Sequence, residues 1–426
     1  MPSEARSLPR EGQRDTARLH YGWVITIAAF VVSTVAYGIF YSFGIFFPHI
    51  AAEHGWSYAE AAGAFSVAIV TYGFFAIPMG WASDRYGPRV AVGVGGLIFG
   101  LGIFLGSQVR EVWHLYVVYG LVAALGMGAA YVPLMSTVSR WFVARRGIAL
   151  GIAGLGSGTG TFLFTPLMGQ LIAITGWRQS YVIAGIGGAV LLVAAAAFLI
   201  RDPQSKGMRP YGAGTQAATK ALPKPAARGR DLTLSQAMRT EAFWILQLAF
   251  AIWWVSSLIP YIHGASYARD KGASPVEAAI WLSLFGLGIS LGKVVMGAVA
   301  DHIGSKAAWS ISLIIQIAGM LLLVPAQGVV VLYLLALVIG LGYGGGSPQF
   351  TNLTAEQFGL SSMGTIYGIL FFGVSVLGAV GPVGAGFIRD TAGDYGLAYV
   401  GGAAILALSL MLNLMLRSPR PAGESQ

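Results

Sequence analysis

The sequence contains no cysteine among its 426 residues. A disulfide framework, a thiolate metal site and a cysteine nucleophile are therefore all excluded. Charge is scarce as well: only 10% of the residues are charged, whereas a soluble domain carries about 25%. Combined with 56% hydrophobic residues, this low charge content excludes an ordinary soluble protein and indicates a membrane protein.

The chain also lacks the motifs of common catalytic machinery. It contains no Walker loop and no HExxH sequence, so neither an ATP-driven pump nor a membrane protease has a recognisable catalytic centre. Residues 154–160 are glycine-rich like a dinucleotide-binding loop, but they lie inside a hydrophobic run with no preceding strand. The sequence therefore predicts no enzyme, no cofactor and no metal site.

Long hydrophobic runs dominate what is present. Each has about twenty residues or more, which is enough to cross a bilayer core of ~30 Å. None of them alternates with a period of two, as the strands of a transmembrane barrel do. We expect an all-α polytopic membrane protein with twelve spans. The expected spans are residues 21–47, 59–83, 89–107, 112–138, 146–174, 178–200, 240–268, 274–300, 306–327, 329–355, 363–388 and 395–416.

The excess of positive charge has a topological explanation. The 26 Lys and Arg residues outnumber the 17 Asp and Glu residues by nine; twenty of these cations lie on one side of the expected spans and five on the other. Because cytoplasmic segments are enriched in Lys and Arg, we expect both termini and the central segment to be cytoplasmic, in a plasma membrane of the bacterial inner-membrane type. No nucleic acid partner is implied.

The polar segments divide the chain. Residues 1–20 form an N-terminal arm that is expected to be solvated or to lie on the lipid surface. Residues 201–230 combine Pro, Gly, Ala and Lys/Arg with almost no bulky apolar side chains, which predicts a flexible linker. The expected units are a cytoplasmic arm 1–20, a six-helix bundle 21–200, a cytoplasmic linker 201–239, a six-helix bundle 240–416 and a cytoplasmic tail 417–426.

The two bundles share an internal repeat at an offset of 217 residues. Two copies of one six-helix unit explain it most economically, and such pseudo-symmetric halves are a transporter architecture with the substrate between them near the middle of the bilayer. Close helix packing is expected at the spacings Gly147/Gly151 and Gly364/Gly368. The repeated positions are Gly80, Asp84, Gly87 and Arg89 with Gly297, Asp301, Gly304 and Lys306, and Gly147, Gly151 and Gly156 with Gly364, Gly368 and Gly373.

Residues 80–89, GWASDRYGPR, and residues 297–306, GAVADHIGSK, resemble the signature loop of the major facilitator superfamily. The resemblance implies the major facilitator fold. It also implies a latch in which Asp84 and Asp301 accept hydrogen bonds between the halves while Arg85, Arg89 and Lys306 bind carboxylates and helix C-termini. Alternating access would break and remake this latch.

A second resemblance is narrower. Residues 141–154, WFVARRGIALGIAG, resemble the fifth-helix signature of the monocarboxylate transporters and the related oxalate:formate antiporters, and residues 21–23, YGW, are similar to the aromatic motif that enters their first helix. These motifs mark the branch and not the substrate.

One cation, Lys293, lies within a predicted span, eight residues before Asp301. It is expected roughly 12 Å inside the end of its helix, where a lone cation costs at least ~2.5 kcal/mol. No acidic residue lies deep in any span, so an anionic substrate is the natural partner; the alternative is a lysine that snorkels to the surface or binds loose carbonyls. Neighbouring glycines suggest a packed helix face. They are Gly288, Gly292 and Gly297.

The resemblance strengthens the assignment of Lys293. The residue falls where both related families carry an eighth-helix arginine that binds the substrate carboxylate; a lysine loses the planar fork of arginine but keeps its charge. Dicarboxylate exchangers of this group carry a second cation in the eleventh helix, seven residues after the tyrosine of a Tyr-Gly pair. That position here is Val374, seven residues after Tyr367. A single carboxylate is therefore favoured over oxalate.

Other polar residues in the spans are further candidates for substrate binding. His263 stands where Pro260 and Gly264 loosen the helix; it is expected either to serve in proton coupling and substrate binding or to be a satisfied core histidine. By resemblance Tyr131 and Tyr343, together with the similarly placed Tyr41, would line the substrate path, with core packing as the alternative. Asn352 is a further candidate for the cavity wall.

These observations predict a secondary transporter of small monocarboxylates of the lactate and pyruvate type. Proton-coupled symport by alternating access is expected, with Lys293 or His263 relaying the proton, and no protein partner beyond the membrane lipid is required. An anion exchanger of the oxalate:formate type remains the alternative within transport. A membrane receptor or scaffold is the alternative of another class, and the sequence offers no appended soluble domain for it.

Overall fold

The computed structural model describes residues 20–143, 145–213, 232–359 and 363–417. Nearly all of the expected arm and tail, and residues 214–231 of the linker, lie outside these ranges. The described residues are almost entirely helical, and their one isolated β-bridge joins Phe142 to Tyr211. The expectation of an all-α polytopic protein is confirmed.

Eleven helices in the described residues are long and apolar enough to cross a membrane. The first half contains α1 (Tyr21–Tyr41), α2 (Phe43–His54), α3 (Tyr58–Tyr86), α4 (Pro88–Gly106), the interrupted run α5 (Val112–Leu115), η1 (Tyr116–Ala123), α6 (Ala124–Met127), η2 (Gly128–Ala130) and α7 (Val132–Trp141), and α8 (Arg146–Ala196). The second half contains α11 (Glu241–Asp270), α12 (Pro275–Ile303), α13 (Ser305–Leu323), α14 (Val329–Phe358), α15 (Met363–Gly378), α16 (Val380–Ala392) and α17 (Gly396–Met415).

The apolar part of α8 crosses the membrane twice. It has 49 residues, and a straight helix of that length would extend about 74 Å, more than twice the ~30 Å bilayer core. The chain turns at Gly176, whose φ of 77° and ψ of 162° are not helical. Eleven continuous helices therefore make the twelve spans that the sequence predicts.

The internal repeat is visible in the way the helices begin and end. Ser57 and Glu60 form a capping box at the start of α3, and Ser274 and Glu277 form the same box at the start of α12, at the 217-residue offset. Both helices have 29 residues, and each ends at a glycine with a φ near 90°. Such reciprocal hydrogen bonds fix where a helix starts, so the two halves share local signals as well as spans.

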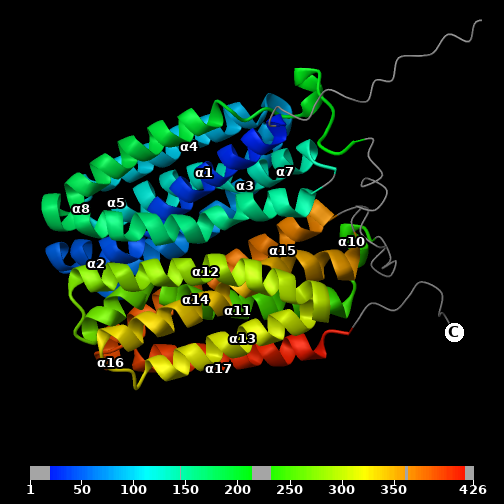
Figure 1. Cartoon of the computed structure of the whole chain (residues 1–426). Coiled ribbons are helices and arrows are strands. Elements are labelled where there is room, and N and C mark those ends of the chain that lie inside the picture. The colour runs from blue at the N-terminus through cyan, green and yellow to red at the C-terminus, as the bar shows by residue number, and fades with distance from the viewer. Residues whose placement is uncertain (1–19, 144, 214–231, 360–362, 418–426) are drawn as a thin grey trace, which may run out of the picture.

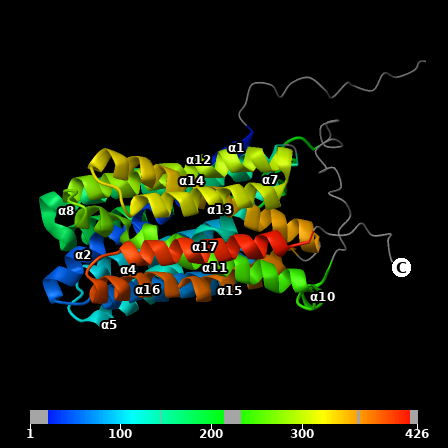
Figure 2. The same cartoon turned by 90° about the horizontal axis from the view of Figure 1, so that it is seen from below.

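The two halves lie against each other with their helices running in the same general direction, as Figure 1 and Figure 2 show. One end of the molecule, here called the linker end, carries α7 and the short helix α10 (Leu234–Ala237). The other end, here called the opposite end, carries α2 and α16. Substrate access therefore has to be considered separately at each end.

Glycines allow α12 and α14 to pack at backbone contact. A Cβ atom on Gly288 or on Gly292 would overlap the backbone of α14. Small residues permit this close approach, and in a membrane van der Waals packing drives helix association. The packed face expected from the sequence therefore exists at these two glycines, whereas Gly297 faces open space.

The first part of the linker is not free, contrary to expectation. Tyr211 N donates to Trp141 O at 2.8 Å, and Val143 N donates to Tyr211 O at 3.0 Å. The Tyr211 ring also packs against Phe142 and Trp23. Backbone hydrogen bonds and ring packing at Tyr211 together hold this segment against the first half, which the composition of the segment did not reveal.

Candidate substrate site

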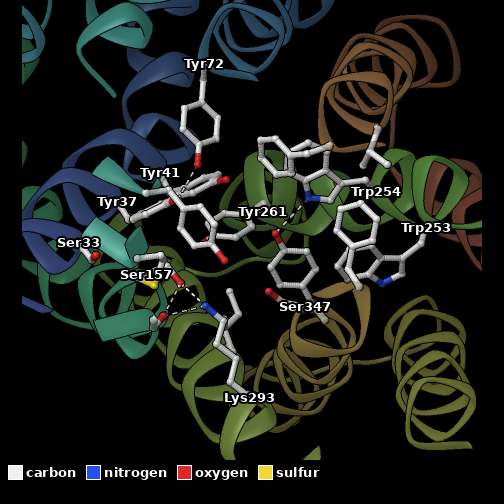
Figure 3. A pocket seen from close by; sticks show the side chains of 18 of the residues that line it. Ser33, Tyr37, Tyr41, Tyr72, Ser157, Trp253, Trp254, Tyr261, Lys293 and Ser347 are labelled. Carbon is white, nitrogen blue, oxygen red and sulfur yellow. Dashed lines mark hydrogen bonds between the residues drawn. The ribbon is translucent and has the colours of Figure 1, made fainter. Parts of the chain in front are cut away.

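A cavity lies between the two halves, and both contribute to its wall (Figure 3). From the first half it is lined by Ser33, Tyr37, Tyr41, Tyr72, Tyr131, Met135, Gly154 and Ser157. From the second half it is lined by Trp253, Trp254, Tyr261, Ile289, Lys293, Tyr343, Ser347, Phe350, Tyr367, Phe371 and Val374. Lys293 is the single charged side chain among these described lining residues.

Lys293 connects the halves through hydrogen bonds. Its Nζ donates to Gly154 O at 3.0 Å and to Ser157 Oγ at 2.5 Å, both on α8 (Figure 3). The ammonium group does not extend toward the lipid surface but ends at the cavity wall, held by a carbonyl and a hydroxyl. Both partners are neutral, so the positive charge is solvated but not neutralised by them.

The described lining residues include no second cation. Val374 lines the cavity, and at the 217-residue offset it corresponds to Ser157, the hydroxyl partner of Lys293. The pseudo-symmetric positions thus differ in chemistry: one side binds a cation and the other is apolar. This cavity offers one charged anchor for one anionic group.

Aromatic side chains form most of the remaining wall. Tyr131, Tyr343 and Tyr41, three residues expected on the substrate path, all line the cavity. Tyr41 stacks on Tyr261 of the other half with ring centroids 3.9 Å apart. Trp254 Nε1 donates to Tyr343 Oη at 3.3 Å.

His263 and Asn352 do not line this cavity. His263 is completely buried, and its ring nitrogens contact Tyr395 Oη at 2.9 Å and Pro382 O at 2.8 Å. Asn352 donates from Nδ2 to Gln349 Oε1 at 3.3 Å. Each of the two stands two residues after a lining residue, which is about 200° around a helix. Both therefore face away from the cavity.

Several lining residues were missed by the sequence reasoning. Ser33 and Tyr37 precede Tyr41 by eight and four residues, so helical spacing from an expected residue could have found them. Ser157 had no such signal, because its role depends on which helix packs against α12.

The signature-loop residues at the linker end bind within their own halves. Asp84 pairs with Arg140 at 2.6 Å, a partner that the sequence reasoning missed. Arg89 donates to Ala197 O at the end of α8, and Lys306 Nζ donates to Leu416 O at 2.6 Å. The guanidinium of Arg85 lies over the Trp81 and Tyr86 rings. The side chain of Asp301 lies outside the described part of the structure.

The opposite end is closed by contacts between the halves. Asp390 of α16 accepts hydrogen bonds from Tyr58 N at 3.1 Å and from Ala59 N at 2.9 Å, at the start of α3. A carboxylate is favourable there because helix N-termini carry unpaired N–H groups and positive partial charge. Gly386 packs against the Ala59 backbone, where a Cβ atom would come within 2.8 Å.

At the linker end the described residues show no such contact between the halves. Among the described residues, hydrogen bonds between the halves lie at the cavity and at the opposite end. The close packing expected at Gly151 and Gly368 is accordingly wrong, since a Cβ atom on either would meet no atom within 4 Å. The surroundings of the expected partners Gly147 and Gly364 lie outside the described part of the structure.

Two pseudo-symmetric six-helix halves around a central cavity define the class of secondary membrane transporters. The sequence comparison is consistent with this class, because residues 29–264 and 248–426 match the family described as Major Facilitator Superfamily. The chain belongs to the major facilitator superfamily, an integral membrane transporter family and not a family of enzymes.

The chain is similar to named transporters over most of its length. Monocarboxylate transporter 13 from Bos taurus is 28% identical over 396 residues, covering 92% of this chain and 88% of that protein. Monocarboxylate transporter 11 from Homo sapiens is 29% identical over 409 residues, covering 92% and 82%. A crystal structure of a D-xylose-proton symporter is 15% identical with a TM-score of 0.75, covering 95% of this chain and all of that one, which supports the fold alone.

Proposed function

We propose that the protein is a symporter that carries small monocarboxylates of the lactate and pyruvate type together with a proton by alternating access. Lys293 supports this proposal most directly, because it is the one charged group among the described cavity residues and its hydrogen-bond partners are neutral. Val374, which corresponds to Ser157 at the 217-residue offset, is apolar, and this favours a substrate with one carboxylate over a substrate with two. The names of the relatives as monocarboxylate transporters support the same substrate class.

Ser33 supports the choice of 2-hydroxy and 2-oxo acids. Its Oγ is buried and has no hydrogen-bond partner among the described residues. Figure 3 places Ser33 and Ser157 on the same side of the cavity as the Lys293 ammonium. A buried hydroxyl without a partner is costly, and the 2-oxygen of lactate or pyruvate would satisfy it while the carboxylate binds Lys293.

The proton is proposed to be bound where Lys293 meets the substrate and to cross the membrane together with the substrate. No carboxylate is among the described lining residues that could carry it, and His263 is bonded on both nitrogens outside the cavity. Bringing an anion and a proton across together makes the step electroneutral. In this proposal the linker end is cytoplasmic, and Asp84 exchanges Arg140 for a partner in the other half when that end closes.

Uptake of labelled lactate into proteoliposomes is expected to accelerate several-fold when the outside is made more acidic than the lumen. The pH gradient supplies the driving force only if a proton crosses with the substrate. Preloading the lumen with unlabelled lactate at equal pH provides the control. Uptake that ignores the pH gradient but depends on internal anion would contradict symport and support an exchanger of the oxalate:formate type.

Substitution of Gly151 by leucine is expected to reduce transport at least about tenfold and to leave the melting temperature within a few degrees. Gly151 lies one helical turn before the cavity residue Gly154 and faces open space. A leucine there fits the present state but would obstruct closure of the linker end. Gly187→Leu, also at a position with nothing within 4 Å, is the matched control on α8. Normal transport by Gly151→Leu would show that this surface does not close.

A further inference from the structure

The cavity wall is far more aromatic than a lactate-sized substrate requires. Eleven of its nineteen described lining residues are Tyr, Trp or Phe, and three are aliphatic. Lactate and pyruvate offer a carboxylate, an oxygen and one methyl group, so most of this wall would find no partner in them. We infer that the substrate joins its carboxylate to an aromatic ring, as in aryl-substituted 2-hydroxy and 2-oxo acids.

The rings from the two halves form one connected surface. Tyr37 stacks on Tyr41 with centroids 5.9 Å apart, and Tyr41 stacks on Tyr261 at 3.9 Å across the interface. Tyr261 then meets Tyr343 edge to face at 5.7 Å. Aromatic pairs prefer offset and edge-to-face arrangements at 4.5–7 Å; the Tyr37–Tyr41 and Tyr261–Tyr343 pairs lie in this range, and the Tyr41–Tyr261 contact is closer. A substrate ring would extend this arrangement and would bridge the halves as it does so.

Several tyrosine hydroxyls of the wall already have hydrogen-bond partners within the protein, so these residues offer the cavity mainly their ring surfaces. Tyr37 Oη and Tyr72 Oη lie 2.7 Å apart, and Tyr261 Oη lies 2.8 Å from Thr161 Oγ1. Tyr343 Oη accepts from Trp254. A substrate rich in hydroxyl groups would have to break these bonds, whereas an aromatic ring would leave them intact.

The same cavity discriminates against aromatic acids that carry an amine. Such a substrate would bring an ammonium group close to Lys293, and the described lining residues include no carboxylate to neutralise it. Like charges in a cavity of low dielectric repel strongly. The expected cargo is therefore an aryl acid with a neutral 2-substituent. This inference rests on the proposed function, since Lys293 must first bind a carboxylate.

The experiment measures binding to the purified full-length protein by calorimetry with four probes: lactate, 3-phenyllactate, 3-cyclohexyllactate and phenylalanine. Burial and stacking of one ring are expected to make 3-phenyllactate bind about 30-fold more tightly than lactate. The cyclohexyl analogue controls for size and is expected to bind about threefold less tightly than 3-phenyllactate. Phenylalanine is expected to bind at least tenfold less tightly than 3-phenyllactate.

A pair of adjacent phenylalanines supplies the matched variants. Phe371 lines the cavity and Phe372 does not. Phe371→Leu is therefore expected to weaken binding of 3-phenyllactate several-fold and to leave the affinity for lactate within twofold. Phe372→Leu is expected to leave both affinities unchanged. If lactate binds as tightly as 3-phenyllactate, the inference is overturned while the proposed function stands. If no carboxylate binds, the proposed function itself has failed.

Discussion

Replacement of Lys293 by methionine is expected to reduce carboxylate transport at least about 30-fold while the protein remains folded. Loss of one partner from a buried, hydrogen-bonded charge pair costs about 2–5 kcal/mol, and about 2 kcal/mol already corresponds to roughly 30-fold in affinity. Methionine has a similar length and no charge. It would leave Gly154 O and Ser157 Oγ without their present donor, but these two groups have other local hydrogen-bonding options on a helix.

Lys293→Arg is the matched control for this prediction. It keeps the positive charge and adds a planar fork that suits a carboxylate, so measurable transport is expected to remain. Binding of 3-phenyllactate by calorimetry and uptake into proteoliposomes are the two measurements, with melting temperature as the check on folding. If Lys293→Met transported at the rate of the unmodified protein, Lys293 would not be a substrate-binding residue.

The twelve spans and the position of Lys293 could be predicted because the bilayer constrains both. Backbone polar groups in hydrocarbon must be satisfied within the helix, so hydrophobic run length translates directly into structure. The offset of 217 residues likewise predicted two copies of one six-helix unit, and α3 and α12 have the same length and the same capping box. A cation inside such a run is costly, which singled out Lys293.

The direction in which each polar side chain points could not be predicted in the same way. A helix buried in a membrane protein is apolar toward lipid and toward protein alike, so periodicity does not identify its inner face. His263 shows the consequence, because it lies two residues beyond Tyr261 and faces Tyr395 instead of the cavity. Asn352, a candidate for the cavity wall because it is polar and lies in a predicted span, is likewise not among the lining residues.

Contacts between distant segments could not be predicted from the sequence for another reason. Arg140 pairs with Asp84 only because the chain folds the end of α7 next to the end of α3. The empty space around Gly151 reflects the conformation: in the described part of the chain, carboxylate contacts join the halves at the opposite end, and Gly151 meets no atom of the other half. One sequence must satisfy both states of an alternating transporter, and a local pattern does not say which state is observed.

Substitution of Gly292 by leucine is expected to prevent stable folding of the second half. A Cβ atom on Gly292 would already overlap the Leu341 carbonyl on α14, as one on Gly288 would overlap Leu337 one turn earlier. Adding even small groups to a packed interface costs about 1–3 kcal/mol, and leucine adds four carbons where the backbones touch. We expect a melting temperature at least about 10 °C lower, or no monodisperse protein in detergent.

Gly297→Leu provides the comparison on the same helix. Its Cβ atom would meet nothing within 4 Å, so the melting temperature is expected to stay within a few degrees of the unmodified value. Both glycines belong to α12, so helix propensity changes equally and only the contact with α14 differs. Equal melting temperatures for the two variants would mean that α12 and α14 separate at little cost. Lys293, which follows Gly292 directly, would then owe its position to its bonds with α8 rather than to the glycine packing beside it.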